Sequence, residues 1–346
     1  DSRVYDITSS SLSQPDRSAP AESIFNGAYA ASGRLNLYAN ASSGRYTARD
    51  LNAGGFAMVE LPLGSRIRLI GGARLERSGI RVRTLTVNGG DTTSRLYDTD
   101  LLPALAATIA LTPAMNVRLS ASQTLSRPEY RELSPVTYFD IIGGSRLFGK
   151  ADLRRALIQN YDVRWEWYPR AGEVVSVGVF AKRFDSPIER VLVQTSDGNS
   201  PDITFENARG ADNYGVELEF RRGLDILANG LAPFAVFTNA TVMRSDIRTP
   251  TGGLSSLTND DRPMVGQAPY VLNLGLSYTH PRSHLSATLL FNRVGRRILD
   301  AGILPLPDTY EEARSLVDLS IQFPVAGSVM GKVDGKNLLD APYLVT

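Results

Sequence analysis

The stretch Tyr270–Tyr278, with the sequence YVLNLGLSY, alternates between two kinds of side chain. One face carries Tyr, Leu, Leu, Leu and Tyr, and the other carries Val, Asn, Gly and Ser, which is the two-residue period of a β-strand with one apolar face. The two tyrosines are separated by roughly 26 Å along such a strand, or roughly 20 Å along an axis from which the strand tilts by about 40°. The pattern predicts a strand that crosses a bilayer with a tyrosine near each interface.

The same alternation recurs elsewhere in the chain. In Tyr161–Trp167 (YDVRWEW), one face of the strand carries Tyr, Val, Trp and Trp, and the other carries Asp, Arg and Glu. In Tyr214–Phe220 (YGVELEF), one face carries Tyr, Val, Leu and Phe, and the other carries Gly, Glu and Glu. A basic side chain on a lipid face at mid-bilayer would cost about 2–4 kcal/mol, so the charged faces are expected to line a barrel lumen. The residues predicted to face the lumen are Arg164, Glu166, Glu217 and Glu219.

Short turns and long loops alternate along the chain. Compact turns such as 62–65 and 169–172 are built on proline and glycine, and much longer polar connections lie between them. An antiparallel up-and-down meander with short turns on one side and long loops on the other is typical of an all-β outer-membrane barrel. The predicted strands are 52–62, 66–82, 96–111, 115–126, 158–168, 173–185, 212–222, 232–246, 265–280, 283–298, 313–323 and 328–338, and the long loops are 83–95, 127–157, 186–211, 247–264 and 299–312.

This pattern predicts three regions. We expect residues 1–51 to form a long extracellular loop region, residues 52–340 to form the strands with their turns and loops, and residues 341–346 to begin a further extracellular loop. About twelve strands could close a small barrel or form an arc of a larger one. The loop-like start of the chain and its end directly after an outbound strand favour the arc.

Composition excludes several other classes of protein. No segment approaches 18 consecutive apolar residues, which excludes a helical membrane protein, and the net charge of +1 gives no indication of a nucleic-acid partner. With no cysteine and only His280 and His284, the chain offers little to a metal site or a catalytic triad, so we expect no enzyme activity, no catalytic residues, no metal and no cofactor. A soluble β-sandwich would not show short and long loops that alternate strictly by side.

Several motifs resemble those of one known family. Arg118–Leu133 (RLSASQTLSRPEYREL) resembles the "S-x-x-x-x-R-P-x-x-x-E-L" strand end of TonB-dependent outer-membrane receptors. Further segments similar to the C-terminal half of the receptor barrel follow in the family's order, and together the resemblance covers nearly all of residues 50–346. These segments are 161–169, 179–189, 213–219 and 336–340.

The resemblance implies a function, a location and partners. Members import a scarce solute, such as an iron chelate, a vitamin or a glycan, through the outer membrane of Gram-negative-type bacteria, and the TonB protein drives this uptake by moving a plug domain inside a 22-stranded barrel. No segment here resembles the plug, its energy-coupling box or the closing strand. We therefore expect about 12 of 22 strands, with Arg164, Glu166, Glu217 and Glu219 facing the plug, and with outer-membrane lipid and lipopolysaccharide around the barrel. The alternative is a receptor-like barrel that serves as a scaffold in a larger envelope complex.

Ligand contacts are expected in the extracellular loops, since receptors of this kind bind their small-molecule or glycan substrate there. Aromatic and arginine side chains in two of these loops are the candidates. Packing within the loop or contact with lipopolysaccharide is the alternative role for each of them. For Arg127, a role in strand-end structure is favoured over contact with a substrate. The candidates are Tyr138, Phe139, Arg146 and Phe148 in the loop 127–157, and Arg296, Arg297 and Tyr310 in the later loops.

Overall fold

The structure is a computed structural model of the 346-residue chain. It describes residues 5–8, 20, 23, 27–32, 36–39, 45–85, 91–139, 146–193, 201–249, 257–259 and 261–346. Most of the loop region 1–51 that the sequence predicts lies outside the described residues. Where residues 1–51 are described, the structure has two short paired strands, β1 (Tyr5–Thr8) and β2 (Asn36–Ala39), a short helix α3 (Gly27–Ala31), and the start of a long strand at Arg45.

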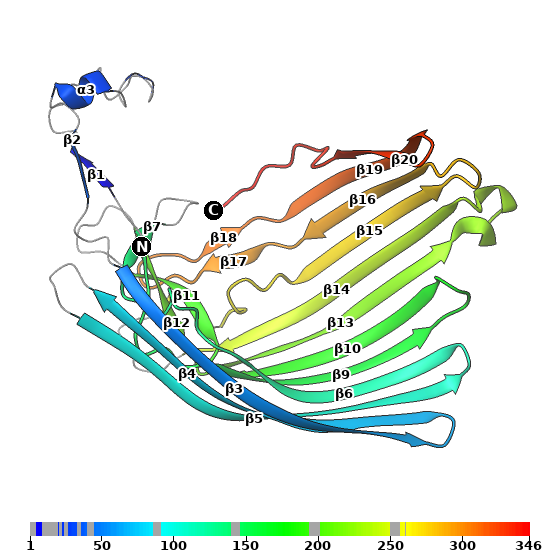
Figure 1. The fold of residues 1–346 in the computed structure, drawn as a ribbon, viewed down its shortest axis with the longest axis horizontal. Helices are drawn as coiled ribbons and strands as arrows, with labels where there is room; N and C mark the ends of the chain where they lie inside the picture. Colours follow the sequence, from blue (N-terminus) through cyan, green and yellow to red (C-terminus); the bar gives the residue numbers. More distant parts are fainter. Residues whose placement is uncertain are drawn as a thin grey trace.

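One twelve-stranded sheet dominates the described part of the molecule (Figure 1). Each strand pairs with the next in an antiparallel meander, so the predicted fold class is confirmed, and β3 and β20 form the two edges of the sheet. The order is β20-β19-β16-β15-β14-β13-β10-β9-β6-β5-β4-β3. These strands are β3 (Arg45–Leu63), β4 (Ile67–Leu85), β5 (Asp91–Thr112), β6 (Met115–Ser126), β9 (Ala156–Trp167), β10 (Val174–Asp185), β13 (Gly210–Gly223), β14 (Phe234–Arg248), β15 (Tyr270–Thr279), β16 (Ser286–Val294), β19 (Arg314–Ala326) and β20 (Val329–Gly335).

The register separates a polar face of the sheet from an apolar one. Arg118 of β6 lies opposite Arg164 of β9, and Gly178 of β10 lies opposite both Arg164 and Glu217, so these residues share one face. The other face carries exposed apolar side chains that follow one another across the same four strands, namely Leu119, Val163, Val179 and Val216. A wide strip of exposed apolar side chains on one face is what lipid contact requires. The short turns 64–66, 113–114 and 327–328 lie at the opposite end of the strands from the long connections.

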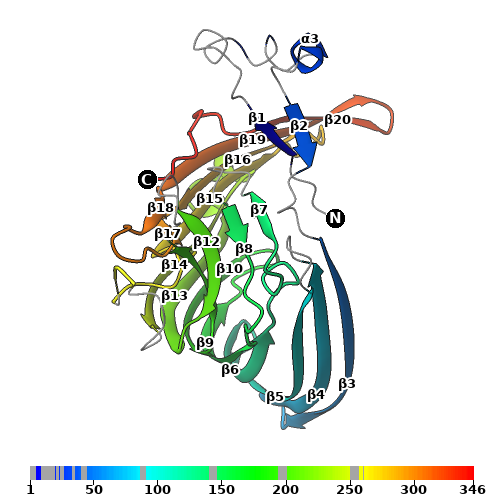
Figure 2. The ribbon, with the colours of Figure 1, turned by 90° about the vertical axis from the view of Figure 1, so that its left-hand side faces the viewer.

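The long connections contain strands of their own, which the sequence prediction missed. Four of them form a second sheet in the order β11-β12-β8-β7, and two more form a hairpin. Figure 2 shows β7, β8 and β12 within the curve of the large sheet. These elements are β7 (Thr137–Phe139), β8 (Arg146–Phe148), β11 (Ile188–Val193), β12 (Asp202–Asn207), β17 (Arg297–Asp300) and β18 (Thr309–Glu311), and the 3-10 turns η1 (Leu224–Ile226) and η2 (Asn229–Leu231) lie between β13 and β14.

The prediction that 83–95 is a loop was wrong, since β4 extends to Leu85 and β5 begins at Asp91. The alternation along β4 reverses near Ser78, and this reversal explains the error. Between the short turn and Ser78, the apolar side chains of β4 point to the convex, outer face, as Leu75 does with 55% of its surface exposed. Beyond Ser78, toward the long connection, the apolar side chains point to the concave, inner face, as Val82 does with 0% exposed. The inner side of the upper strand packs against the small sheet, while Arg81 and Arg83 on its outer side are exposed.

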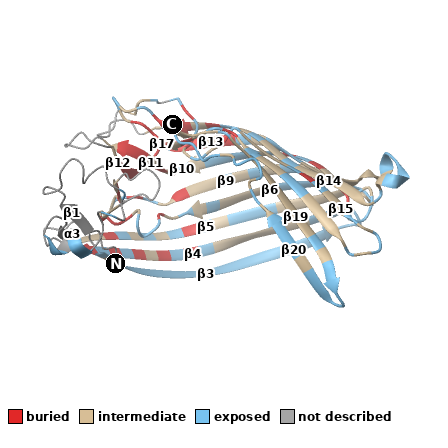
Figure 3. Cartoon of the chain, turned by 90° about the horizontal axis from the view of Figure 1, so that it is seen from above, coloured by how far each residue is buried: buried red, intermediate tan, exposed pale blue. Residues whose placement is uncertain are grey.

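The apolar core of the described residues lies at this upper end. Ile80 and Val82 of β4 pack with side chains from the long connections and their small sheet, namely Leu133, Leu147, Leu192, Ile203 and Phe205. Figure 3 shows buried residues gathered at the end of the sheet that carries β11 and β12, while β3 is exposed along its length. Among the described residues, no helix is both long enough and apolar enough to cross a membrane.

Candidate functional site

A row of paired charges lines the concave face of the sheet. Arg118 Nε donates to Glu166 Oε2 at 2.8 Å, and Arg164 Nε lies 3.2 Å from Glu166 Oε1. Arg164 also pairs with Glu219 two strands away, across β10, where Gly178 leaves room for the long side chain. Glu217 is exposed on the same face. The four residues predicted to face the lumen therefore lie on the concave face, and their contact with a plug stays a prediction.

Above this wall, the long connections form a layer that we call the cap: the sheet β7-β8-β12-β11 together with the hairpin β17–β18. Its two parts are joined at β11. The backbone N–H of Leu192 donates to the carbonyl of Ala301 at 2.8 Å, and Arg190 Nε pairs with Asp300 Oδ1 at 2.7 Å. Residues 110 positions apart thus belong to one layer, which lies over the concave face at the end with the long connections (Figure 2).

A second buried ion pair attaches the connection between β14 and β15 to the cap. Arg262 Nη2 lies 2.7 Å from Glu189 Oε2, and both side chains are almost fully buried, with 3% and 4% of their surface exposed. Glu189 Oε1 also accepts the backbone N–H of Val265 at 2.8 Å. Because the Glu189 carboxylate already accepts hydrogen bonds at both oxygens, the pair holds the cap together, while Arg262 Nε is buried and has no hydrogen-bond partner among the described residues.

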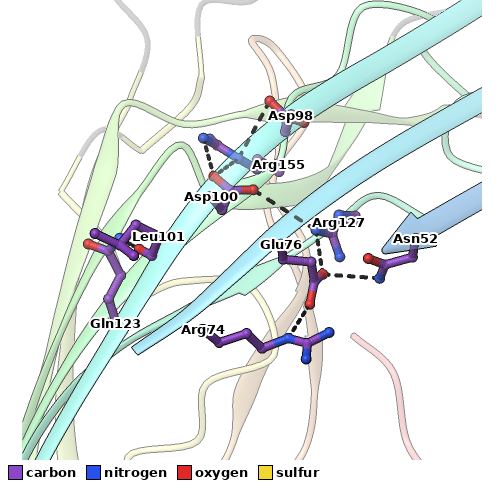
Figure 4. A network of polar contacts seen from close by, with 9 residues as sticks. All are labelled: Asn52, Arg74, Glu76, Asp98, Asp100, Leu101, Gln123, Arg127 and Arg155. Carbon is purple, nitrogen blue, oxygen red and sulfur yellow. Dashed lines mark hydrogen bonds and ion pairs between the residues drawn. The ribbon is translucent and has the colours of Figure 1, made fainter. Parts of the chain in front are cut away.

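The base of the loop between β6 and β9 is fixed by arginines at both of its ends (Figure 4). Arg127 follows β6 and its Nη2 lies 2.7 Å from Glu76 Oε1, while Arg155 precedes β9 and its Nε donates to Asp100 Oδ1 at 2.7 Å. Asp98 completes the group, with its Oδ1 3.5 Å from Arg155 Nε. We call this group of ion pairs the rim network.

The rim network lies where β5 and β6 separate. Starting from their short turn, the two strands pair as far as Ala104 opposite Ser122. The part of β5 farther from the turn, from Pro103 back to Asp91, has no partner in β6. Beyond that point the Gln123 side chain reaches across instead, and its Nε2 donates to the carbonyl of Leu101 at 2.9 Å. The two arginines of the rim network therefore replace missing backbone pairing with charge-assisted contacts. Strand-end structure was the role that the sequence favoured for Arg127, and the carboxylate partners of Arg127 on β4 and β5 could not be identified without the register.

Three of the predicted ligand contacts lie on the cap and already have protein partners. Tyr138 packs against the apolar core and its hydroxyl donates to the carbonyl of Arg131, whose guanidinium lies 5.6 Å from the centre of the ring. Arg146 Nε pairs with Asp202 Oδ1 at 2.9 Å, and the carbonyl of Phe148 accepts the Thr204 hydroxyl at 3.1 Å. Phe139 lies in β7, and its side chain is outside the described part of the structure.

The remaining predicted contacts lie on and beside the β17–β18 hairpin. Arg296 stacks on the ring of Tyr310 at 3.8 Å from its centre and pairs with Glu312 at 2.8 Å, and Arg297 Nη2 lies 2.7 Å from Glu311 Oε2. Arg296, Arg297 and Tyr310 also line a groove of about 400 Å³ at the rim, together with Arg244 and Gln267. The structure thus brings the predicted contacts together as two groups on one cap, and substrate binding by either group stays a prediction.

Burial changes the acidity of two groups in the cap. It raises the pKa of the Tyr138 phenol well above its usual range, because the ring packs into the core and the ionised form would lose its hydration. Burial also raises the pKa of the Glu132 carboxyl, although the backbone N–H of Glu129 donates to it and acts in the opposite direction. Between β6 and β7, Leu133 and Ser134 are buried, whereas Glu129, Tyr130 and Arg131 are exposed.

The comparisons with known proteins agree with this architecture. The family described as "TonB dependent receptor-like, beta-barrel" matches residues 6–338, so the chain belongs to the TonB-dependent receptor β-barrel family. This family consists of transport receptors of the Gram-negative outer membrane and not of enzymes. A search of the curated proteins found no match.

Solved structures show the same fold at low sequence identity. The ferric yersiniabactin uptake receptor FyuA of Yersinia pestis is 19% identical with a TM-score of 0.58, over 88% of this chain and 44% of its own. The ferric-catecholate import receptor Fiu of E. coli K12 is 13% identical with a TM-score of 0.62, over 89% and 43%. The copper transporter OprC is 15% identical with a TM-score of 0.64, over 90% and 45%. The chain thus spans less than half the length of these three proteins.

Proposed function

We propose that this chain is the wall and mouth of an outer-membrane receptor that imports a scarce solute, with an iron chelate as the first candidate. The observation that carries the proposal is the cap over a charged concave face. A channel for passive diffusion needs an open mouth, whereas here the strands β7, β8, β11 and β12 lie within the curve of the wall, and the loop that carries β7 and β8 is anchored by the rim network. Uptake through such a barrel requires selective binding at the cap, followed by an opening step.

Further partners and the location follow from family membership. The proposed partners are a plug domain within the concave face, the TonB energy-coupling protein acting through that plug, and the lipid of a Gram-negative-type outer membrane. The charge row Arg118–Glu166–Arg164–Glu219 provides polar groups for a plug to contact. Two of the similar structures are receptors for ferric chelates and one is a copper transporter, and this supports an iron chelate over a vitamin or a glycan. The scaffold alternative has no comparable support.

Uptake by whole cells tests this proposal. A strain that lacks the gene, and the same strain complemented with it, are supplied with radiolabelled ferric catecholate, a ferric phenolate chelate and copper. We expect one iron chelate to accumulate only in the complemented strain, and accumulation to stop when the proton-motive force is dissipated. Equal accumulation in both strains for every probe would contradict import, and accumulation that survives de-energisation would indicate a passive pore.

A further inference from the structure

The part of β5 that lies toward the long connections extends beyond its neighbour β6. β5 pairs with β4 from Ile109 to Asp91, but with β6 only as far as Ala104. Between residues 93 and 99, no described residue forms a hydrogen bond with the backbone on the side of β5 that faces away from β4. We call residues 93–99 the free edge of β5. A row of unpaired backbone N–H and C=O groups is a surface on which another strand can pair.

Pro103 marks the point where pairing with β6 ends. The carbonyl of Leu101 accepts Gln123 Nε2 of β6 at 2.9 Å (Figure 4), so the backbone groups of Leu101 point toward β6. Alternate residues of a strand direct their backbone groups to the same side, so those of Pro103 and of residues 93, 95, 97 and 99 also point away from β4. Proline has no N–H and is found in edge strands. Pro103 therefore cannot donate to β6, and the ladder stops beside it.

β14 also extends beyond its neighbour, but there the protein covers the edge itself. Pairing of β14 with β15 ends at Val242. Beyond it, the N–H of Met243 donates to the carbonyl of Pro269 at 2.9 Å. The N–H of Ile247 likewise donates to the carbonyl of Arg262 at 3.1 Å. The connection after β14 thus replaces the missing strand, whereas the free edge of β5 has no such cover from the described part of the chain.

Contacts beside the free edge are made on the inner face, by side chains. Arg155 pairs with Asp98 and Asp100, at 3.5 Å and 2.7 Å. The Ser94 hydroxyl donates to the carbonyl of Leu133 at 2.7 Å. These contacts fix the position of the strand and leave its outward backbone groups unpaired. Because the edge is already ordered, a strand that pairs with it loses less entropy in binding.

The free edge lies outside the hydrocarbon layer. Thr99 is ten residues from Ile109, the register partner of Ile67 at the start of β4, which is roughly 25 Å along the membrane normal for a strand tilted by about 40°, the height of the apolar band. Thr93 is roughly 15 Å higher. An unpaired strand edge is not tolerated in lipid. The long-connection end of the wall lies outside the cell in the proposed function, so a protein at the cell surface can reach this edge.

The outer face of β3, β4 and β5 indicates which strand would fit. Arg49, Arg81 and Arg95 are register partners in one row that ends at the free edge, and all three are exposed. None of them forms an ion pair with a described residue. The next row runs from Leu51 to Tyr97, which are 62% and 67% exposed. An added strand would extend both rows, with an acidic side chain beside Arg95 and an apolar one beside Tyr97.

We propose that the free edge of β5 binds an extended acidic segment of another protein at the cell surface, which joins the sheet as a strand beside β5. Backbone hydrogen bonds provide the affinity, and the acidic residue beside Arg95 and the apolar residue beside Tyr97 provide the specificity. A second copy of this chain does not fit, since pairing of two free edges would bring two rows of arginines together. The inference rests on the outward orientation in the proposed function, but it concerns the wall and not the solute site.

The test uses the full receptor purified in mild detergent and a fluorescent synthetic peptide with the repeat Thr-Glu-Thr-Val, whose binding is measured by anisotropy. One control peptide carries lysine in place of glutamate. Another is N-methylated at the glutamates and valines, whose N–H groups would face β5. Thr99→Pro removes one N–H from the free edge, and Thr99→Val is its control. Arg95→Gln removes the charge, and Arg183→Gln, at an arginine that is 67% exposed on β10, is the matched control.

We expect the acidic peptide to bind the wild type, and both control peptides to bind at least about tenfold more weakly, because several hydrogen bonds or the charge match are lost. Thr99→Pro should weaken binding about two- to tenfold through the loss of one hydrogen bond. Arg95→Gln should weaken it roughly two- to fivefold, as for an exposed ion pair. Thr99→Val and Arg183→Gln should match the wild type.

Three results would overturn the proposal. They are no binding of the acidic peptide, equal binding of the N-methylated peptide, which would mean attraction by charge alone, and a receptor dimer that Thr99→Pro dissociates. Heat-modifiable migration in gels checks that each variant is folded, and the methylated peptide tests the edge on the wild type if Thr99→Pro does not fold. Solute uptake is measured separately: absence of uptake by the wild type contradicts the proposed function, whereas absence of peptide binding contradicts only this inference.

Discussion

Single arginine residues fix the cap to the wall of this protein, and their effect depends on burial. Arg127 is 16% exposed and lies between Glu76 and Asp100, whose side chains are 9% and 2% exposed. Arg68, on the same strand as Glu76, pairs with Glu60 at 3.4 Å, but both side chains are largely exposed, at 64% and 49%. Without Arg127, Glu76 would keep Arg74 and Asn52 and Asp100 would keep Arg155, but each carboxylate would lose one contact in a poorly hydrated place, whereas an exposed pair is replaced by water.

Arg127→Ala is therefore expected to lower the free energy of unfolding by about 1–3 kcal/mol, because Glu76 and Asp100 lose a charged hydrogen-bond partner in a poorly hydrated place. Urea-induced unfolding of the protein in lipid vesicles measures this change. Arg68→Ala is the control, with an expected effect below about 1 kcal/mol. If the two variants lose the same stability, the rim network does not hold the loop.

At the scale of elements, the cap and the upper half of β4 depend on one another. Leu133, just after the S-x-x-x-x-R-P motif, is 1% exposed and packs in the same cluster as Ile80 and Val82. The Thr84 and Ser134 hydroxyls lie 2.9 Å apart beside it, also buried. The segment after β6 is therefore part of the core, even though Leu133 and Ser134 themselves lie outside any strand.

Leu133→Ala should loosen the cap without unfolding the barrel. Truncation of a fully buried leucine costs about 2–5 kcal/mol, and here that cost falls on the cap, whose sheet strands have only three to six residues. Limited proteolysis of the folded protein should cut the connections 127–155 and 186–209 faster, with the transmembrane fragment intact. Leu304→Ala, at a leucine that is 60% exposed in the β17–β18 hairpin, is the control. Unchanged cleavage of Leu133→Ala would show that the cap is held by its ion pairs and not by its core.

The sequence predicted the twelve long strands closely and the cap poorly, for a physical reason. In a bilayer, apolar residues must point outward, and the parts of the strand 115–126 and its neighbours nearest the short turns follow that rule, with Val117 and Leu119 opposite Trp165 and Val163. In the cap, strands such as Arg146–Phe148 pair with distant segments as well as with chain neighbours, so neither loop length nor period indicates them. The candidate contacts in 127–157 lie on the cap, and their contact with a ligand stays a prediction. The ion pairs that engage Arg146 and Arg297 depend on register.

At the scale of the whole molecule, the wall has two different ends. Short turns such as 64–66 and the 3-10 turns near Leu227 lie at one end, and the cap and the long connections lie at the other (Figure 1). Barrels of this kind place short turns in the periplasm and long loops outside the cell. The chain contains no cysteine, so one introduced thiol reports its own side without interference.

Leu304→Cys and Leu227→Cys form a matched pair for this purpose, since the two leucines are 60% and 73% exposed at opposite ends of the strands. A maleimide that cannot cross the outer membrane should label Leu304→Cys on intact cells and leave Leu227→Cys unlabelled. Both should react after the outer membrane is permeabilised. Labelling of Leu227→Cys alone on intact cells would mean that the barrel is inserted in the opposite direction.

The reversal of alternation along β4 also constrains the order in which the protein is assembled. Ile80 and Val82 acquire their partners Leu192, Ile203 and Phe205 from segments more than one hundred residues later in the chain. Until those segments arrive, the upper part of β4 carries an apolar stripe toward an unfilled interior, which is the kind of surface that leads to misassembly. The wall can therefore form hairpin by hairpin, but the core beneath the cap cannot be completed before the strands through β12 are in place.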